Sequence, residues 1–400
     1  MGAALRYFTE RIQERPEAAS EAGLTRLHVR LHSQLEFVLI TLDGENPYRI
    51  FKTLNSTGVD LEEGDLIRNF VFMHEAVDRQ DEFHDQYWKP LERRFEDSSS
   101  HLNGRAMSAF FRDFLMKDGM YVPLAATYQQ FESRYSGTAV VVRDVARELG
   151  VHADDYDIIR SAARHPTSAV EDALTKLSQL DSSTTYPLLL NMLARVRVGP
   201  MPEPHLVQSV ELLSGFILRR YICSEISRAY GRWFVTACRE LADAPLEHLG
   251  SFLSSKGFPP DGRFKEAFVR FPLYGSNYAR AILEAIERHH GHKEPADLSQ
   301  TQIEHIMPQT LSPKWREDVG PEAGETHARW LHTIGNLTLS AYNPELYNKR
   351  FSCKKEAYHR SNVVMTGEVA KYSRWAAEEI EARGEALAEV AAEMWVGPGK

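Results

Sequence analysis

Apolar residues recur at helical spacing along most of the chain. The clearest stripe lies in "LVQSVELLSGFILRRYI" and consists of Leu206, Val210, Leu213 and Ile217. These positions are three or four residues apart, so they form one apolar face of a helix. Breakers such as "GPMPEP" and "GFPPDG" separate segments of this kind, as loops do in helical bundles. The pattern predicts an α-helical domain over residues 76–295.

The beginning of the chain combines helical and strand patterns. "AALRYFTERIQ" predicts a helix that ends near Pro16, and the apolar, β-branched run from Leu35 to Asp43 predicts one buried strand. Asp60 or the "EEG" after it can cap a further helix. A single buried strand needs partner strands, so residues 1–75 are predicted to be the C-terminal remnant of a larger domain.

The composition becomes polar and irregular at residues 288–300, "RHHGHKEPADLSQ", which predicts a domain boundary. Beyond it, "IEHIM" and "GNLTLS" predict short strands and "PELYNKRFSCKKEAY" predicts a helix. A long final helix is expected from Glu368 to Trp395. We predict a small α+β domain at residues 296–400, within a chain that is mainly α. The "HHGH" run is compatible with a metal cluster or with an exposed loop.

Composition and charge narrow the classes of protein. Of the 400 residues, 43% are hydrophobic and 26% charged, as in ordinary globular proteins, and the net charge is −9. The three cysteines form no Cys-x-x-Cys pair, which fits a reducing compartment and excludes a thiolate zinc site. There is no signal-peptide pattern, and the longest apolar runs are too short to span a bilayer. We expect a soluble, cytoplasmic protein without membrane contact.

The segment after residue 303 contains the groups that phosphodiester hydrolysis needs: a base for water, a cation and a residue that holds the base. His305 has the imidazole suited to proton removal. Glu304 points to the opposite face of a strand, although a kink could bring both groups to one metal. Asn336 could hold the His305 ring. An amide oxygen of Asn343 or Asn348 could complete an oxygen-rich site for Mg²⁺ or Mn²⁺.

A basic stretch in this acidic chain could contact DNA phosphates. It contains Lys349, Arg350, Lys354, Lys355, Arg360, Lys371 and Arg374. Arg219 and Arg220 could contact DNA as well, or could form an ion-paired helix face. From the residues alone, His305 is compatible with a catalytic or a structural role, and Trp315, Trp330 and Trp395 are expected in the core.

Two motifs carry a resemblance to known families. "EHIMPQ…GNLTLS…N…K" resembles the HNH, or His-Me finger, nuclease pattern. More closely, "IEHIMPQTLSPKW…LHTIGNLTLSAYNPELYNKRFSCKKEAY" resembles the C-terminal nuclease domain of GmrSD and SspE type restriction enzymes. Those enzymes act on modified phage or foreign DNA and carry an N-terminal ParB-like domain that senses or hydrolyses nucleotide. "YRIFKTLNSTGVDLEEGDLIRNFVF" resembles the end of that domain.

The resemblance implies a ββα-metal (HNH) fold with a C-terminal helix and gives each site residue a role. His305 takes the place of the base that activates water, and Asn336 that of the residue that orients the catalytic loop. Glu304 replaces the commoner Asp as a metal ligand. The last ligand is Asn343, with Asn348 as the rival. The DNA contacts expected beside this site are Lys349, Arg350, Lys354 and Lys355.

One departure from the family pattern limits the expected activity. The Asp-Gly-Gln-Gln-Arg signature of the ParB-like core is missing, so nucleotide hydrolysis by this chain is not expected. The missing nucleotide-sensing domain becomes an expected partner, beside double-stranded DNA and a possible second copy. We predict a metal-dependent DNA endonuclease in restriction or antiviral defence. The alternatives are a non-catalytic helical DNA-binding or regulatory module with a degenerate nuclease fold and, less favoured, nicking of RNA.

Overall fold

The computed structural model describes most of the chain. The described residues are 2–16, 20–36, 61–136, 141–161, 165–180, 182–241 and 245–397. The chain divides into two units, Met1–Asp60 and Leu61–Lys400. The predicted strand from Leu35 to Asp43 lies, from residue 37 onward, outside the described residues.

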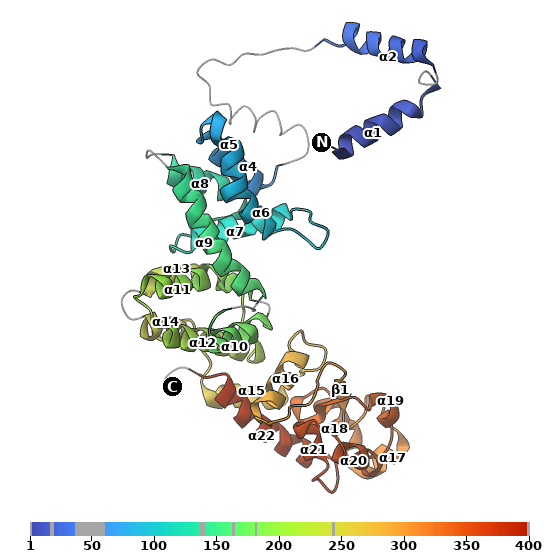
Figure 1. The fold of residues 1–400 in the computed structure, drawn as a ribbon. Coiled ribbons are helices and arrows are strands. Elements are labelled where there is room, and N and C mark those ends of the chain that lie inside the picture. Colours follow the sequence, from blue (N-terminus) through green and yellow to red (C-terminus); the bar gives the residue numbers. More distant parts are fainter. Residues whose placement is uncertain are drawn as a thin grey trace. The chain divides into compact units, whose positions relative to one another are not determined.

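The first unit contains α1 (Gly2–Gln13) and α2 (Glu21–Ser33) (Figure 1). The helix predicted to end near Pro16 is confirmed by α1. Ser20 caps α2, because its side chain accepts a hydrogen bond from the backbone N–H of Gly23 at 3.2 Å.

The second unit begins with a helical region whose core is aromatic. Its helices are α4 (Glu63–Met73), α5 (Gln80–Phe83), α6 (Lys89–Arg93), α7 (Gly104–Met116), α8 (Thr127–Tyr135) and α9 (Val142–Ser161). Phe70 and Phe111 of this core both meet the ring of Phe131 in edge-to-face contacts. The helix predicted to begin after Asp60 is confirmed by α4, where the backbone N–H of Glu62 donates to the Asp65 carboxylate.

A second group of helices follows in the chain. It consists of α10 (Ser168–Ser178), α11 (Tyr186–Val198), α12 (Glu203–Ile222), α13 (Tyr230–Glu240) and α14 (Pro245–Ser255). The stripe predicted on α12 is confirmed, since Leu206, Val210, Leu213 and Ile217 are all buried. This helix packs against α10, α11 and α14. It therefore forms the centre of this group, as its two-sided burial requires.

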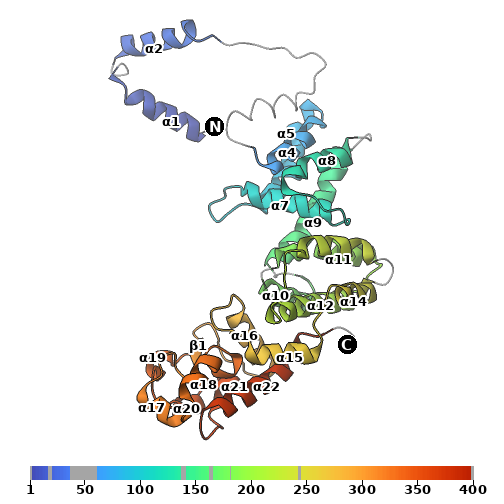
Figure 2. The ribbon, with the colours of Figure 1, turned by 180° about the vertical axis from the view of Figure 1, so that it is seen from behind.

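The C-terminal part contains the only strands among the described residues. Its elements are α15 (Asp261–Arg270), α16 (Ala279–His289), β1 (Gln302–His305), α17 (Pro313–Val319), α18 (Ala323–Trp330), β2 (Leu337–Ser340), α19 (Asn343–Leu346), α20 (Phe351–His359), α21 (Val364–Val369) and α22 (Ala377–Met394). The strands pair antiparallel, with Glu304 opposite Thr338 and His305 opposite Leu337. Helices α15, α16 and α18 pack against α22, and these elements lie together in both views (Figure 1, Figure 2).

Three expectations for this part need correction. The loop expected between the strands contains α17 and α18, and Ser312 caps α17 through the N–H of Trp315. The helix expected over "PELYNKRFSCKKEAY" is divided into α19 and α20, because Tyr347 has a positive φ of 32° that a helix does not accept. The final helix begins at Ala377, after the separate helix α21.

The described residues form a mostly helical fold with one small two-stranded sheet, which confirms the mainly α class predicted from the sequence. The three tryptophans expected in the core, Trp315, Trp330 and Trp395, are buried. Within the described ranges, no helix is long and apolar enough to cross a membrane.

Candidate active site

Asn336 fixes the chain segment that follows His305. Its side chain is fully buried and uses all of its amide positions. The oxygen accepts hydrogen bonds from the Met307 N–H at 2.8 Å and the Trp375 indole N–H at 3.0 Å. The amide nitrogen donates to the carbonyls of Met307 at 2.9 Å and Leu331 at 3.0 Å. The structure thus brings Asn336 to the backbone beyond His305 rather than to the imidazole ring.

Helix α22 holds the turn that contains Asn336. The guanidinium of Arg383, on this helix, donates to the carbonyls of Ile334, Gly335 and Leu337 at 3.1, 2.8 and 2.8 Å. Burial lowers the pKa of Arg383 to about 10, so it remains charged at neutral pH. A Cβ at Gly335 would lie 2.1 Å from the Ile380 carbonyl oxygen, so only glycine permits this approach.

His305 ends β1 and is 6% exposed. Its Nε2 lies 3.2 Å from Nδ1 of His332, and its Nδ1 lies 3.4 Å from Nε2 of Gln309. The ring of Tyr274 meets the imidazole edge-to-face, with 4.3 Å between the centroids. Burial, followed by the charges of His332 and Lys354, lowers the pKa of His305 to about 3. His305 is therefore a neutral imidazole at neutral pH, the form that accepts a proton.

Glu304 forms a buried ion pair on the other face of β1. Its carboxylate lies 2.7 Å from Nζ of Lys354 and accepts a hydrogen bond from the Tyr358 hydroxyl at 3.2 Å. The Lys354 ammonium also donates to the carbonyls of His305 and Ile306 at 3.0 and 3.1 Å. Burial raises the pKa of Glu304, against the opposite effect of Lys354. The ion pair of Glu304 and Lys354 thus fixes the backbone at His305.

The residues predicted to contact DNA lie in different environments. Lys354 has no exposed surface, so its burial in the Glu304 pair contradicts a phosphate contact by this side chain. Arg350 is paired with Asp318 and with Glu317. Lys349 is exposed and Lys355 half-buried. Of the four residues predicted to contact DNA, Lys349 and Lys355 therefore remain available for a phosphate contact.

Asn343 and Asn348, the two alternatives for the last metal ligand, lie in different environments. Asn343 begins α19, and its side chain lies outside the described residues. Asn348 follows Tyr347 and is half-buried; its Oδ1 is buried without a hydrogen-bond partner in the described structure. An orphaned oxygen of this kind favours Asn348 as a ligand-binding group.

Among the described residues, Glu304 and His305 do not face one shared cation position. The Glu304 carboxylate holds an ammonium, and His305 points to partners on the opposite face of β1. In the part of the chain that the structure describes, no three His, Cys, Asp or Glu side chains group as metal ligands. This also applies to the "HHGH" run, in which His289 and His292 are exposed and His289 faces Glu393 at 3.9 Å.

Arg219 and Arg220 are buried, not exposed to DNA. Arg219 donates to the carbonyls of Trp395, Pro259 and Ala392 and pairs with Asp261. Arg220 donates to backbone carbonyls at the end of α14. Both arginines thus join segments far apart in the sequence, which corrects the DNA-contact role. Their pairs with Asp261 and Glu225 agree with the ion-paired alternative.

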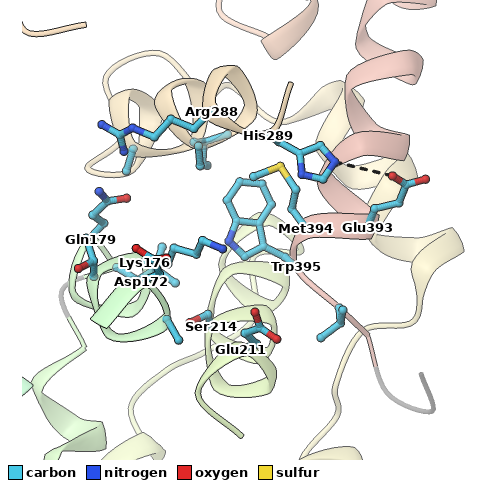
Figure 3. A pocket seen from close by; sticks show the side chains of 17 residues that line it. Asp172, Lys176, Gln179, Glu211, Ser214, Arg288, His289, Glu393, Met394 and Trp395 are labelled. Carbon is cyan, nitrogen blue, oxygen red and sulfur yellow. Dashed lines mark ion pairs between the residues drawn. The ribbon is translucent and has the colours of Figure 1, made fainter. Parts of the chain in front are cut away.

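A cavity of about 580 Å³ lies apart from these groups, at the end of α22 (Figure 3). Trp395 stands among charged side chains of α10, α12 and α16, and His289 and Glu393 form an ion pair on one side of it. None of the predicted site residues lines this cavity. It is therefore not the candidate active site.

Sequence reasoning missed three neighbours of His305. His332 lies four residues before Asn336 in "LHTIGN", and Gln309 follows the His-x-x-Pro motif directly. Their proximity to the motifs was a usable signal. Tyr274 gave no such signal, because it comes from the loop between α15 and α16 and reaches His305 through the tertiary fold.

The site thus combines a buried, neutral imidazole at the end of a paired strand with a turn that Asn336 fixes. Residues 258–390 match the family model of the C-terminal domain of GmrSD restriction endonucleases. The match covers less than half of the chain and includes both strands, His305 and Asn336. The resemblance seen in the sequence is confirmed for this segment. A comparison with curated proteins finds no match.

Proposed function

We propose that the C-terminal part of this chain hydrolyses DNA phosphodiester bonds as an HNH-type nuclease of a restriction system. The observation that carries the proposal is the neutral imidazole of His305 at the end of β1, within the segment that matches restriction endonucleases. Two antiparallel strands followed by α20, whose Lys354 and Tyr358 reach back to Glu304, support a ββα arrangement around it.

In the proposed reaction, His305 accepts a proton from water, and the resulting hydroxide attacks phosphorus in line with the leaving 3′ oxygen. A base with a pKa of about 3 is weak, whereas an ideal catalytic base titrates near the working pH. The negative charge of a bound phosphate raises the pKa of His305, because it favours the imidazolium. DNA binding thus prepares the base that acts on it.

The requirement for Mg²⁺ or Mn²⁺ follows from the resemblance and is kept as an expectation. The predicted ligand Glu304 pairs with Lys354, and the proposed steps involve only His305, water and DNA. Modified or foreign double-stranded DNA is the proposed substrate, and a cytoplasmic location is expected with it. A second copy and a nucleotide-sensing domain remain expected partners.

Nicking of supercoiled plasmid DNA with Mg²⁺, with Mn²⁺ and with a chelator tests the proposal. We expect His305→Ala to lower the rate by a factor of about 100 or more. His359→Ala is the matched control, because His359 is an exposed histidine of the same region. Equal cleavage by His305→Ala and the parent would remove the proposal. Salt-sensitive DNA binding without cleavage or Mn²⁺ binding would instead support the non-catalytic module.

A further inference from the structure

His332 lies directly against the catalytic candidate. Its Nδ1 is 3.2 Å from Nε2 of His305, and its ring stacks on Tyr274 at 5.4 Å with 12° between the planes. The carbonyl of His332 accepts a hydrogen bond from the Tyr274 N–H at 3.1 Å. Backbone and ring of His332 are therefore both fixed by the same neighbouring loop, which places its Nδ1 at His305.

The partners of His305 determine which of its nitrogens carries the hydrogen. A neutral imidazole has one donor and one acceptor nitrogen. The amide nitrogen of Gln309 can only donate, so Nδ1 of His305 is the acceptor in this contact. Nε2 of His305 then carries the hydrogen and donates it to Nδ1 of His332.

In this tautomer the basic lone pair of His305 lies on Nδ1, which faces the side chain of Gln309. Gln309 is exposed, and its 3.4 Å contact with Nδ1 is near the long limit for a hydrogen bond. A water molecule can therefore replace this amide at Nδ1. The opposite nitrogen is covered by His332, which cannot leave without movement of the loop that holds it.

We propose that His332 is a positioning residue for His305, which fixes its tautomer and ring orientation so that Nδ1 takes the proton from the attacking water. This inference rests on the proposed nuclease function and adds a residue to the same site. It gives His332 the part that a carboxylate or a backbone carbonyl has in other His-based sites.

The proton transfer balances within the named groups. The O–H bond of water breaks, its proton goes to Nδ1 of His305, and the hydroxide forms a new bond to phosphorus. The bond between phosphorus and the 3′ oxygen breaks, and the leaving oxygen takes a proton from solvent. During this step the imidazolium keeps its Nε2–H bond to His332, which stabilises the positive charge.

Two substitutions at position 332 separate positioning from packing. His332→Leu retains bulk but removes the acceptor, and we expect kcat for nicking to fall about 100-fold with little change in KM. His332→Asn places an amide oxygen at the position of Nδ1, and we expect it to restore much of the lost kcat. His359→Leu, at an exposed position, should leave kcat unchanged. Thermal unfolding shows whether each variant folds.

The ¹⁵N spectrum of the His305 ring provides a readout that packing alone would not change. In the parent and His332→Asn we expect the hydrogen on Nε2, and in His332→Leu a mixture of tautomers. Parent-like kcat and tautomer in a folded His332→Leu would overturn the role of His332 while the nuclease function stands. A folded parent that binds DNA but never nicks it would overturn the proposed function and this inference with it.

Discussion

The charge of His305 depends on burial more than on any single partner. Its pKa of about 3 in the folded chain is below the ordinary 6.5, so between these values the unfolded chain binds the additional proton. Stability contributed by this difference is present above pH 6.5 and is lost as the pH falls toward 3. The other lowered histidine pKa, that of His152, acts in the same direction.

We therefore expect the free energy of unfolding to fall with acidification, by up to about 1.4 kcal/mol per pH unit from His305 alone. Urea unfolding of the parent and of His305→Gln between pH 7 and pH 4 measures this contribution. The variant should lose less stability over this interval. Parallel curves would show that His305 does not titrate below its ordinary range.

The Glu304–Lys354 pair makes a second prediction at the scale of single residues. Lys354→Met leaves a buried carboxylate without its counterion, at a cost of about 3–5 kcal/mol. Adding Glu304→Gln removes the unpaired charge, so the double variant should be more stable than Lys354→Met. Chemical denaturation measures both. If the single variant is as stable as the parent, the ammonium is not needed at this carboxylate.

At the scale of elements, α22 approaches the turn of Asn336 closely through its backbone, at Gly335. Gly335→Ala places a methyl group against the Ile380 carbonyl, and we expect a loss of at least about 1–3 kcal/mol together with reduced nicking. Gly324→Ala, on α18 with open space around it, is the matched control and should be neutral or slightly stabilising. Thermal unfolding and plasmid nicking compare the two. Equal behaviour would mean that α22 can move away from the turn without consequence.

At the scale of the whole second unit, Arg219 of α12 binds the C-terminal end of α22 and so joins α22 to the second group of helices. This side chain is fully buried and donates to the carbonyls of Ala392 and Trp395, and a Cβ at Gly215 would lie 2.3 Å from the Val396 carbonyl oxygen. The same helix carries Arg383 at the candidate site. One rigid element therefore connects α12 to the turn of Asn336.

Arg219→Met should consequently destabilise both regions together. The substitution removes the donor to the buried carbonyls of Trp395, Pro259 and Ala392 and the guanidinium that pairs with Asp261, which costs about 3 kcal/mol or more. We expect one cooperative unfolding transition, shifted to lower temperature, in calorimetry. Arg228→Met, at an exposed arginine, is the control. Two separate transitions, of which only one shifts, would show that the regions unfold independently.

Local patterns were sufficient for several elements of the fold. Apolar spacing predicted α12, and short β-branched runs predicted β1 and β2, because these signals repeat within a few residues. The motifs also selected His305 and Asn336, which the fold brings to one turn, since Ile306 N–H donates to the Asn336 carbonyl at 3.0 Å. Helices α17 and α18 were missed although Ser312 and Pro313 form a recognisable helix start.

The sequence by itself determined the mainly helical class, the two strands and the histidine with its asparagine, because each depends on spacing or on a short motif. The tertiary structure alone decided the partners: Lys354 at Glu304, His332 and Tyr274 at His305, and Arg219 at the end of α22. The sequence does not distinguish a solvated basic residue from one that is buried in an ion pair. Its environment is set by packing between segments far apart in the chain, which no local pattern encodes.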